Sequence, residues 1–168
     1  SSRRPDRQNK QREDPGAQRP VLACGDWPLA VCSWSLRTGP EGVAQALRQL
    51  GLRHVSLALK PVFQENGDLY LETVRRQPWE ISATTIGFFH EDYTSLESIR
   101  TTGGIVPDAF WDENRDRVLR SIAITAELGV RFLTLHAGFI EDEDPARMRR
   151  FRDRLHGLAD AAGERGLS

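Results

Sequence analysis

The residues best suited to chemistry begin with a histidine at the end of an apolar run. His136 lies in LTLHAGF, residues 133 to 139, and is followed at once by the small residues Ala137 and Gly138. A neutral imidazole can bind a divalent metal or hydrogen-bond to a sugar oxygen, and small neighbours let a ligand or another backbone approach closely. The alternative is a structural histidine that is hydrogen-bonded to a neighbouring loop.

A second group of reactive side chains is contiguous in the sequence. One loop contributes an imidazole, two carboxylates and a phenol, from His90, Glu91, Asp92 and Tyr93. Such a cluster can hold a metal or a polyol, although charged loop residues can also be simply solvated. The connection from residue 89 to residue 108 is long for a compact domain, and its Gly103-Gly104 pair is a candidate hinge for a lid.

Two further candidate ligand contacts lie near the ends of predicted strands. Lys60 can pair with a phosphate or carboxylate of a substrate, or it can extend along the surface with its charge in water. Trp34 can stack on a sugar ring or fill the top layer of the core. The sequence has no P-loop, GxGxxG, HExxH or GxSxG pattern, so nucleotide-binding, zincin and hydrolase-elbow functions have no support.

An internal repeat indicates which elements position these residues. LGLRHVSL at residues 50 to 57 and LGVRFLTL at residues 128 to 135 each have the pattern of a helix end, a glycine stop and a strand. Apolar residues at helical spacing predict helices over residues 40 to 50, 108 to 128 and 145 to 166, with a weaker one over 68 to 77. Asp108 or Asp112 is the expected N-cap of the second helix. Alternation and turn residues predict strands over residues 29 to 35, 54 to 60, 81 to 88 and 131 to 136.

This alternation of strands and helices predicts an α/β fold with parallel strands, as an open sheet or a barrel. In such folds the functional residues collect at the carboxyl ends of the strands. Residues 165 to 168 repeat the helix-to-strand junction, so we expect a fifth strand to begin there. The chain is then a fragment, about four of the eight units of a barrel of roughly 250 residues.

Composition restricts the setting in which this domain works. Residues 1 to 20 carry six basic and three acidic side chains, whereas the remainder carries 17 basic and 21 acidic ones. We expect residues 1 to 22 to be a disordered basic tail and residues 23 to 168 to be the folded part. Cys24 and Cys32 match no zinc or redox spacing. No membrane span, signal peptide or nucleic-acid partner is expected, and the cytoplasm is the predicted location.

The segment IGFFHEDYTSLESIRTTGGIVPDAFWDEN, residues 86 to 114, together with the following helix and LTLHAGF, resembles a known family. It is similar to the sugar phosphate isomerase/epimerase family of xylose-isomerase-like TIM barrels, and CSWSL and LGLRHVSLAL agree with this. The resemblance covers residues 29 to 168 and implies a partial (β/α)8 barrel, the amino-terminal half. It also implies a divalent metal (Mn, Mg, Co or Zn) that helps to move protons between adjacent carbons of a sugar or sugar phosphate.

The family's metal-binding residues follow strands five to eight, which this chain does not contain. The resemblance therefore implies that His136 is a substrate-pocket residue and a possible metal ligand, with Glu91, Asp92 and Tyr93 forming the mouth of the pocket. His90 departs from the family pattern and is only a weak metal candidate. The resemblance also implies that the catalytic acid and base lie outside this chain.

Other functions stay open at this stage. One is a sugar-binding or interaction module without catalysis, in which the exposed edge of the half barrel pairs with another chain, for example as a homodimer. Another is a metal-dependent endonuclease or dehydratase on the same barrel. A nuclease would need a basic groove, whereas residues 21 to 168 carry a net charge of −4.

Overall fold

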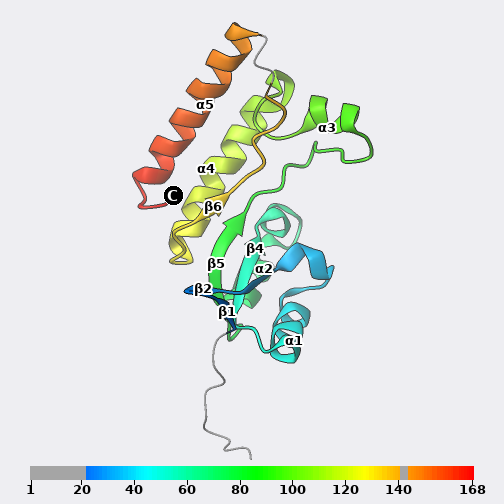
Figure 1. The fold of residues 1–168 in the computed structure, drawn as a ribbon, viewed down its shortest axis with the longest axis vertical. Helices are drawn as coiled ribbons and strands as arrows, with labels where there is room; N and C mark the ends of the chain where they lie inside the picture. The colour runs from blue at the N-terminus through cyan, green and yellow to red at the C-terminus, as the bar shows by residue number, and fades with distance from the viewer. Residues whose placement is uncertain (1–21, 141–143) are drawn as a thin grey trace, which may run out of the picture.

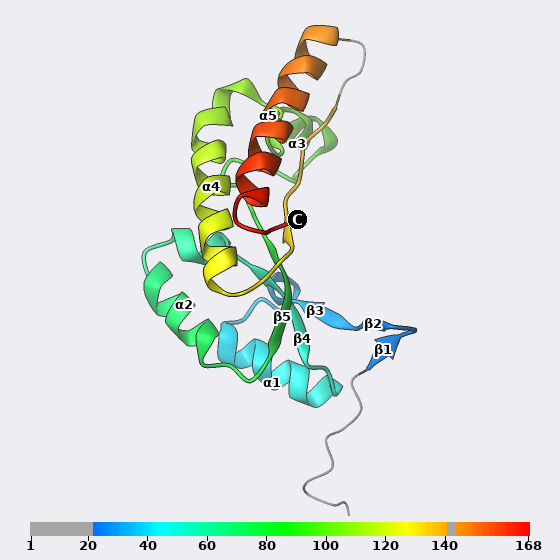
Figure 2. The same cartoon turned by 90° about the vertical axis from the view of Figure 1, so that its left-hand side faces the viewer.

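The computed structural model describes residues 22–140 and 144–168, and within them the four-stranded sheet is parallel with strand order β3-β4-β5-β6 (Figure 1 and Figure 2). The strands are β3 (Ala30–Cys32), β4 (His54–Ala58), β5 (Glu80–Thr85) and β6 (Leu133–Thr134). The long helices are α1 (Pro40–Leu50), α2 (Gly67–Arg75), α4 (Trp111–Glu127) and α5 (Pro145–Gly163). The short elements are the hairpin β1 (Ala23–Cys24) and β2 (Trp27–Pro28), the 3-10 turns η1 (Ser33–Leu36), η2 (Lys60–Phe63) and η3 (Asp108–Phe110), and helix α3 (Leu96–Thr102). These elements form the four predicted β/α units, and the predicted tail lies outside the described residues except for Leu22.

The sheet separates an apolar face from a polar one. Val55, Leu57 and Leu59 are fully buried on one face, and Figure 2 shows α1, α2 and α4 on a single side of the sheet. Burial of such side chains contributes about 1.5 to 3 kcal/mol each. On the other face the hydroxyls of Thr85 and Thr134 lie 2.8 Å apart across adjacent strands. The predicted alternation along these strands is therefore confirmed.

Glycines end the helices of the repeat as the sequence indicated. Gly51 has φ 69° and its N–H contacts the carbonyls of Leu47 and Arg48, which closes α1. Gly129 has φ 70° and occupies the same place after α4. A left-handed residue at this position turns the chain back into the sheet with little steric cost only if it is glycine.

The free edge of β6 pairs with the last described residue. The Ser168 N–H donates to the carbonyl of Arg131 at 2.7 Å, and the Leu133 N–H donates to the carbonyl of Ser168 at 3.1 Å. Ser168 thus forms backbone hydrogen bonds with Arg131 and Leu133, the residues on either side of Phe132, and this is the hydrogen-bond pattern of a parallel ladder. Residue 168 thus lies where the first residue of a further parallel strand is expected.

Two local predictions were wrong. The first predicted strand ends at Cys32, because the chain turns into η1, so Trp34 lies on a 3-10 turn. Helix α4 begins at Trp111 with Phe110 as N-cap and no side-chain cap, so neither Asp108 nor Asp112 caps it. Asp108 is unavailable because its carboxylate contacts arginines of α5.

Candidate functional site

His136 lies two residues beyond β6 on the face of the sheet that the helices leave open. Its Nδ1 is 3.5 Å from Oε1 of Glu91, and its side chain is 44% exposed while that of Glu91 is only 7% exposed. A carboxylate beside Nδ1 favours a proton on that nitrogen, which leaves the lone pair on Nε2. The structure therefore brings together His136 and one of the carboxylates predicted for the mouth.

The Glu91 carboxylate also joins two backbone segments. One oxygen accepts from the N–H of Phe88 and the other from the N–H of Gly104, both at 3.2 Å. A buried carboxylate is stable only when such donors replace water. Glu91 thus fixes the end of β5, the glycine pair and the imidazole relative to one another.

The glycine pair at 103 and 104, the candidate hinge, is a site of close backbone packing. Gly104 has φ 69°, and a Cβ added there would lie 2.3 Å from the carbonyl carbon of Ala137. The Ile105 N–H donates to the Ala137 carbonyl at 3.0 Å, and the buried Asn114 amide donates to the Gly104 carbonyl at 2.8 Å. The small residues around His136 therefore serve a close approach of backbone to backbone, one of the two uses that the sequence suggested.

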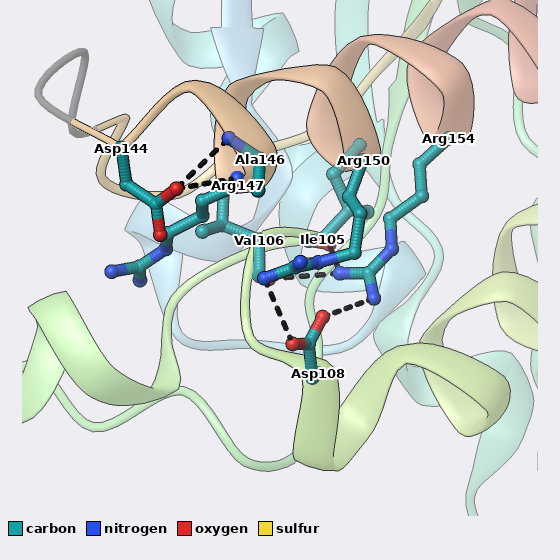
Figure 3. Close-up of polar contacts among 8 residues, drawn as sticks. All are labelled: Ile105, Val106, Asp108, Asp144, Ala146, Arg147, Arg150 and Arg154. Atoms are coloured by element: carbon teal, nitrogen blue, oxygen red, sulfur yellow. Dashed lines mark hydrogen bonds and ion pairs between the residues drawn. The ribbon is translucent and has the colours of Figure 1, made fainter.

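Helix α5 holds this loop from outside. Arg154 Nη1 donates to the carbonyls of Ile105 at 3.0 Å and Val106 at 2.8 Å, and Nη2 pairs with Asp108 (Figure 3). Arg150 lies 3.5 Å from the other oxygen of the same carboxylate. Since Ile105 is bonded to Ala137, this clamp links α5 to the backbone beside His136.

Tyr93 and Asp92 have different roles at the rim. The Tyr93 ring is tilted toward the imidazole of His136, with centroids 6.2 Å apart. Desolvation and the nearby Glu91 carboxylate raise the pKa of Tyr93, so the phenol stays a neutral donor. Asp92 instead accepts from the Thr94 N–H at 2.9 Å, and its bonds to Thr94 lower its pKa. Asp92 shapes the turn before α3, and its carboxylate makes no hydrogen bond or ion pair with His136 among the described residues.

His90 points away from His136, toward α4. Its Nε2 is 2.6 Å from Oε2 of Glu113, and its ring stacks on Phe110 with centroids 4.2 Å apart. The hydrogen bond from His90 lowers the pKa of Glu113. The other Glu113 oxygen pairs with Arg117 at 3.0 Å. The structure thus gives His90 an anchoring contact to α4 and does not place it beside the imidazole of His136.

Trp34 and Lys60 lie together, but apart from His136. Both line a cavity of about 450 Å³ that is bounded by η1, α1, η2 and α2, and neither Glu91, Tyr93 nor His136 contributes to its walls. The sequence pattern grouped Trp34 with the mouth because the predicted strand continued to residue 35. In the structure β3 ends at Cys32, and the 3-10 turn that follows carries Trp34 away from the line of the strand. The candidate site residues therefore fall into two separate groups.

Sequence reasoning missed Asn114, Glu113 and Arg154. They lie on α4 and α5, and each stabilises the loop that carries Glu91 or the backbone beside His136. The signal in the sequence was slight, because all three read as ordinary polar residues of amphipathic helices. Asn114 is nevertheless fully buried, and a short amide in a buried helix position indicates a specific partner.

The metal-binding side chains among residues 22–140 and 144–168 do not form a metal centre by themselves. In the part of the chain that the structure describes, no three His, Cys, Asp or Glu side chains gather closely enough to hold a metal ion. His136 offers one nitrogen with a carboxylate behind it, which is a single ligand of the kind found in metal sites. A complete coordination shell would need residues from elsewhere.

Comparison with solved structures identifies the fold, although no family model and no curated protein match the sequence. A xylose isomerase domain protein from Planctomyces limnophilus aligns with a TM-score of 0.69 and 16% identity, over 84% of this chain and 52% of that one. A xylose isomerase-like TIM barrel protein from Mycobacterium smegmatis, in complex with magnesium, aligns with a TM-score of 0.57 and 14% identity, over 88% of this chain and 55% of that one. L-ribulose 3-epimerase aligns with a TM-score of 0.56 and 18% identity, over 83% of this chain and 47% of that one.

The chain therefore has a partial xylose isomerase-like TIM barrel fold and spans about half the length of these solved structures. The predicted fold class and the resemblance are confirmed at this level. No helix among residues 22–140 and 144–168 is both long and apolar enough to cross a membrane.

Proposed function

We propose that this chain forms part of a sugar isomerase or epimerase of the xylose isomerase-like barrels, with a sugar or sugar phosphate as substrate. The observation that carries the proposal is the His136–Glu91 pair, in which a buried carboxylate holds Nδ1 of an imidazole at the carboxyl end of a strand. This is the end of a β/α barrel at which active sites are found. Structural neighbours that are sugar epimerases support the same class.

In this account His136 binds substrate through Nε2. With the proton held on Nδ1 by Glu91, Nε2 accepts a hydrogen bond from a sugar hydroxyl or from water, and the neutral Tyr93 phenol beside it can donate one. The loop clamp through Gly104 and Arg154 keeps the imidazole in one orientation. A divalent metal bound in the complete barrel would polarise the substrate's carbonyl and hydroxyl oxygens. Among the described residues, His136 is the candidate ligand for this metal.

The test uses a barrel of eight β/α units that contains this half. With Mn²⁺ and a panel of ketoses and ketose phosphates in D₂O, proton NMR should show deuterium incorporated at the carbon next to the carbonyl. His136→Asn should raise KM more than it lowers kcat, because it removes a substrate contact and leaves the acid and base in place. Absence of both deuterium exchange and conversion of every sugar to an isomer or epimer would contradict the proposal, as would a His136→Asn enzyme with unchanged kinetics.

A further inference from the structure

The cavity lined by Trp34 and Lys60 has the chemistry of a second binding site. Its floor is apolar, formed by Val43 and Leu57, which are 2% and 0% exposed. Trp34, 47% exposed, and Trp79 contribute indole rings to its walls. A volume of about 450 Å³ with a largely apolar lining is that of a small-molecule site.

The polar part of the lining has one sign of charge. Arg37 and Lys60 contribute to it and none of the lining residues is acidic. Neither cation forms an ion pair with any of the described residues. The Lys60 stem passes Gly87 and its Nζ lies 5.3 Å from the ring centroid of Phe89, a residue outside the cavity lining, so the ammonium group rests on an aromatic face and would have to turn toward the cavity to meet a ligand there. The Tyr70 phenol on the wall adds no negative charge, because burial raises the pKa of Tyr70 to about 12.

Arg37 occupies its place at a conformational cost. Its φ is 50°, and among residues 22–140 and 144–168 no other non-glycine residue has a left-handed backbone. A glycine would take this conformation without strain, so an arginine here suggests a use for the guanidinium at the cavity. The first turn of α1, from Gly39 and Pro40, borders the same space.

We propose that this cavity binds a small organic anion, a carboxylate or phosphate monoester on a ring or apolar body. The ring packs between the indole of Trp34 and the apolar floor, and the anionic group lies against Arg37 and within reach of the flexible Lys60 side chain. Aromatic faces and an unpaired guanidinium recognise such a ligand by stacking and by bidentate hydrogen bonds. This site is separate from the His136–Glu91 pair and does not depend on the sugar chemistry proposed there.

The test is titration of the 168-residue protein with phenyl phosphate and with benzoate, followed by ¹H–¹⁵N NMR and calorimetry. We expect saturable shifts of the Trp34 and Trp79 indole N–H signals, with phenol and inorganic phosphate each binding at least tenfold more weakly than phenyl phosphate. Arg37→Gly should fold at least as stably, because it relieves the strained φ, and should weaken binding at least tenfold. Arg152→Ala, which removes an exposed cation on α5, should leave binding unchanged.

Three results would overturn the proposal. The first is no saturable binding of either probe at millimolar concentration. The second is an Arg37→Gly protein that binds as tightly as the original chain. The third is a set of shifts centred on Glu91, Tyr93 and His136, which would place the anion at the proposed sugar site instead. The proposed sugar chemistry is read from deuterium exchange, so either idea can fail without the other.

Discussion

Replacement of Arg154 by alanine tests whether α5 stabilises the loop beside His136. Arg154 is 12% exposed and donates to the carbonyls of Ile105 and Val106, residues that are 0% and 5% exposed. Truncation leaves two buried carbonyls without their donor, at about 1 to 3 kcal/mol each. Asp108 is 62% exposed, so loss of that ion pair adds less than about 1 kcal/mol. Because water can reach part of the vacated space, we expect a total loss of about 3 kcal/mol.

Urea unfolding measures this loss, and amide exchange locates it. The N–H of Ile105, which donates to Ala137, should exchange faster in Arg154→Ala. The exchange rate of the Leu57 N–H in β4 should change only as much as the global stability changes. Arg152→Ala is the matched control on the same helix, and it should change stability by no more than about 0.5 kcal/mol because Arg152 is exposed. Equal, small effects of the two substitutions would refute the clamp.

Three further predictions concern the same loop and the helix that holds it. Gly104→Ala should cost more than about 3 kcal/mol in urea unfolding, because it adds a backbone clash to a positive φ, whereas Gly129→Ala, with open space around it, should cost only about 1 to 2 kcal/mol. Glu91→Gln should cost about 1 to 2 kcal/mol, since one backbone N–H loses its acceptor, and imidazole ¹⁵N shifts should show a change in the balance between the Nδ1–H and Nε2–H forms of His136. Asp144→Ala should lower stability at pH 7. Backbone N–H donors at the start of α5 lower the pKa of Asp144, so its contribution is present above the ordinary value of 3.8, and the difference between the two proteins should vanish as the pH falls through the lowered pKa.

Local patterns were sufficient to predict the four parallel strands and the four long helices, but not helix α3 or the β1–β2 hairpin. Gly51 and Gly129 end helices because the left-handed turn is a property of the residue and its immediate neighbours, and the burial of Val55 and Leu57 follows from period-two alternation. The position of His136 followed from the rule that side chains at the carboxyl ends of parallel strands converge. These inferences need no knowledge of distant contacts.

What failed depended on contacts between residues far apart in the chain. Asp108 looks like a helix cap until Arg150 and Arg154, more than forty positions later, take its carboxylate. Trp34 belongs with the mouth only if β3 continues, and the turn at η1 removes it. The burial of Glu91 depends on donors from the ends of β5 and of α3, which no local pattern reveals.

The most direct test of the central claim is calorimetric titration with Mn²⁺ of the 168-residue protein and of a barrel of eight β/α units that contains it. The account predicts tight stoichiometric binding only by the complete barrel, because no three metal-binding side chains gather in the described part of this chain. Tight binding by the 168-residue protein that is lost in His136→Ala would contradict the account. It would show that His136 belongs to a metal site contained within this half.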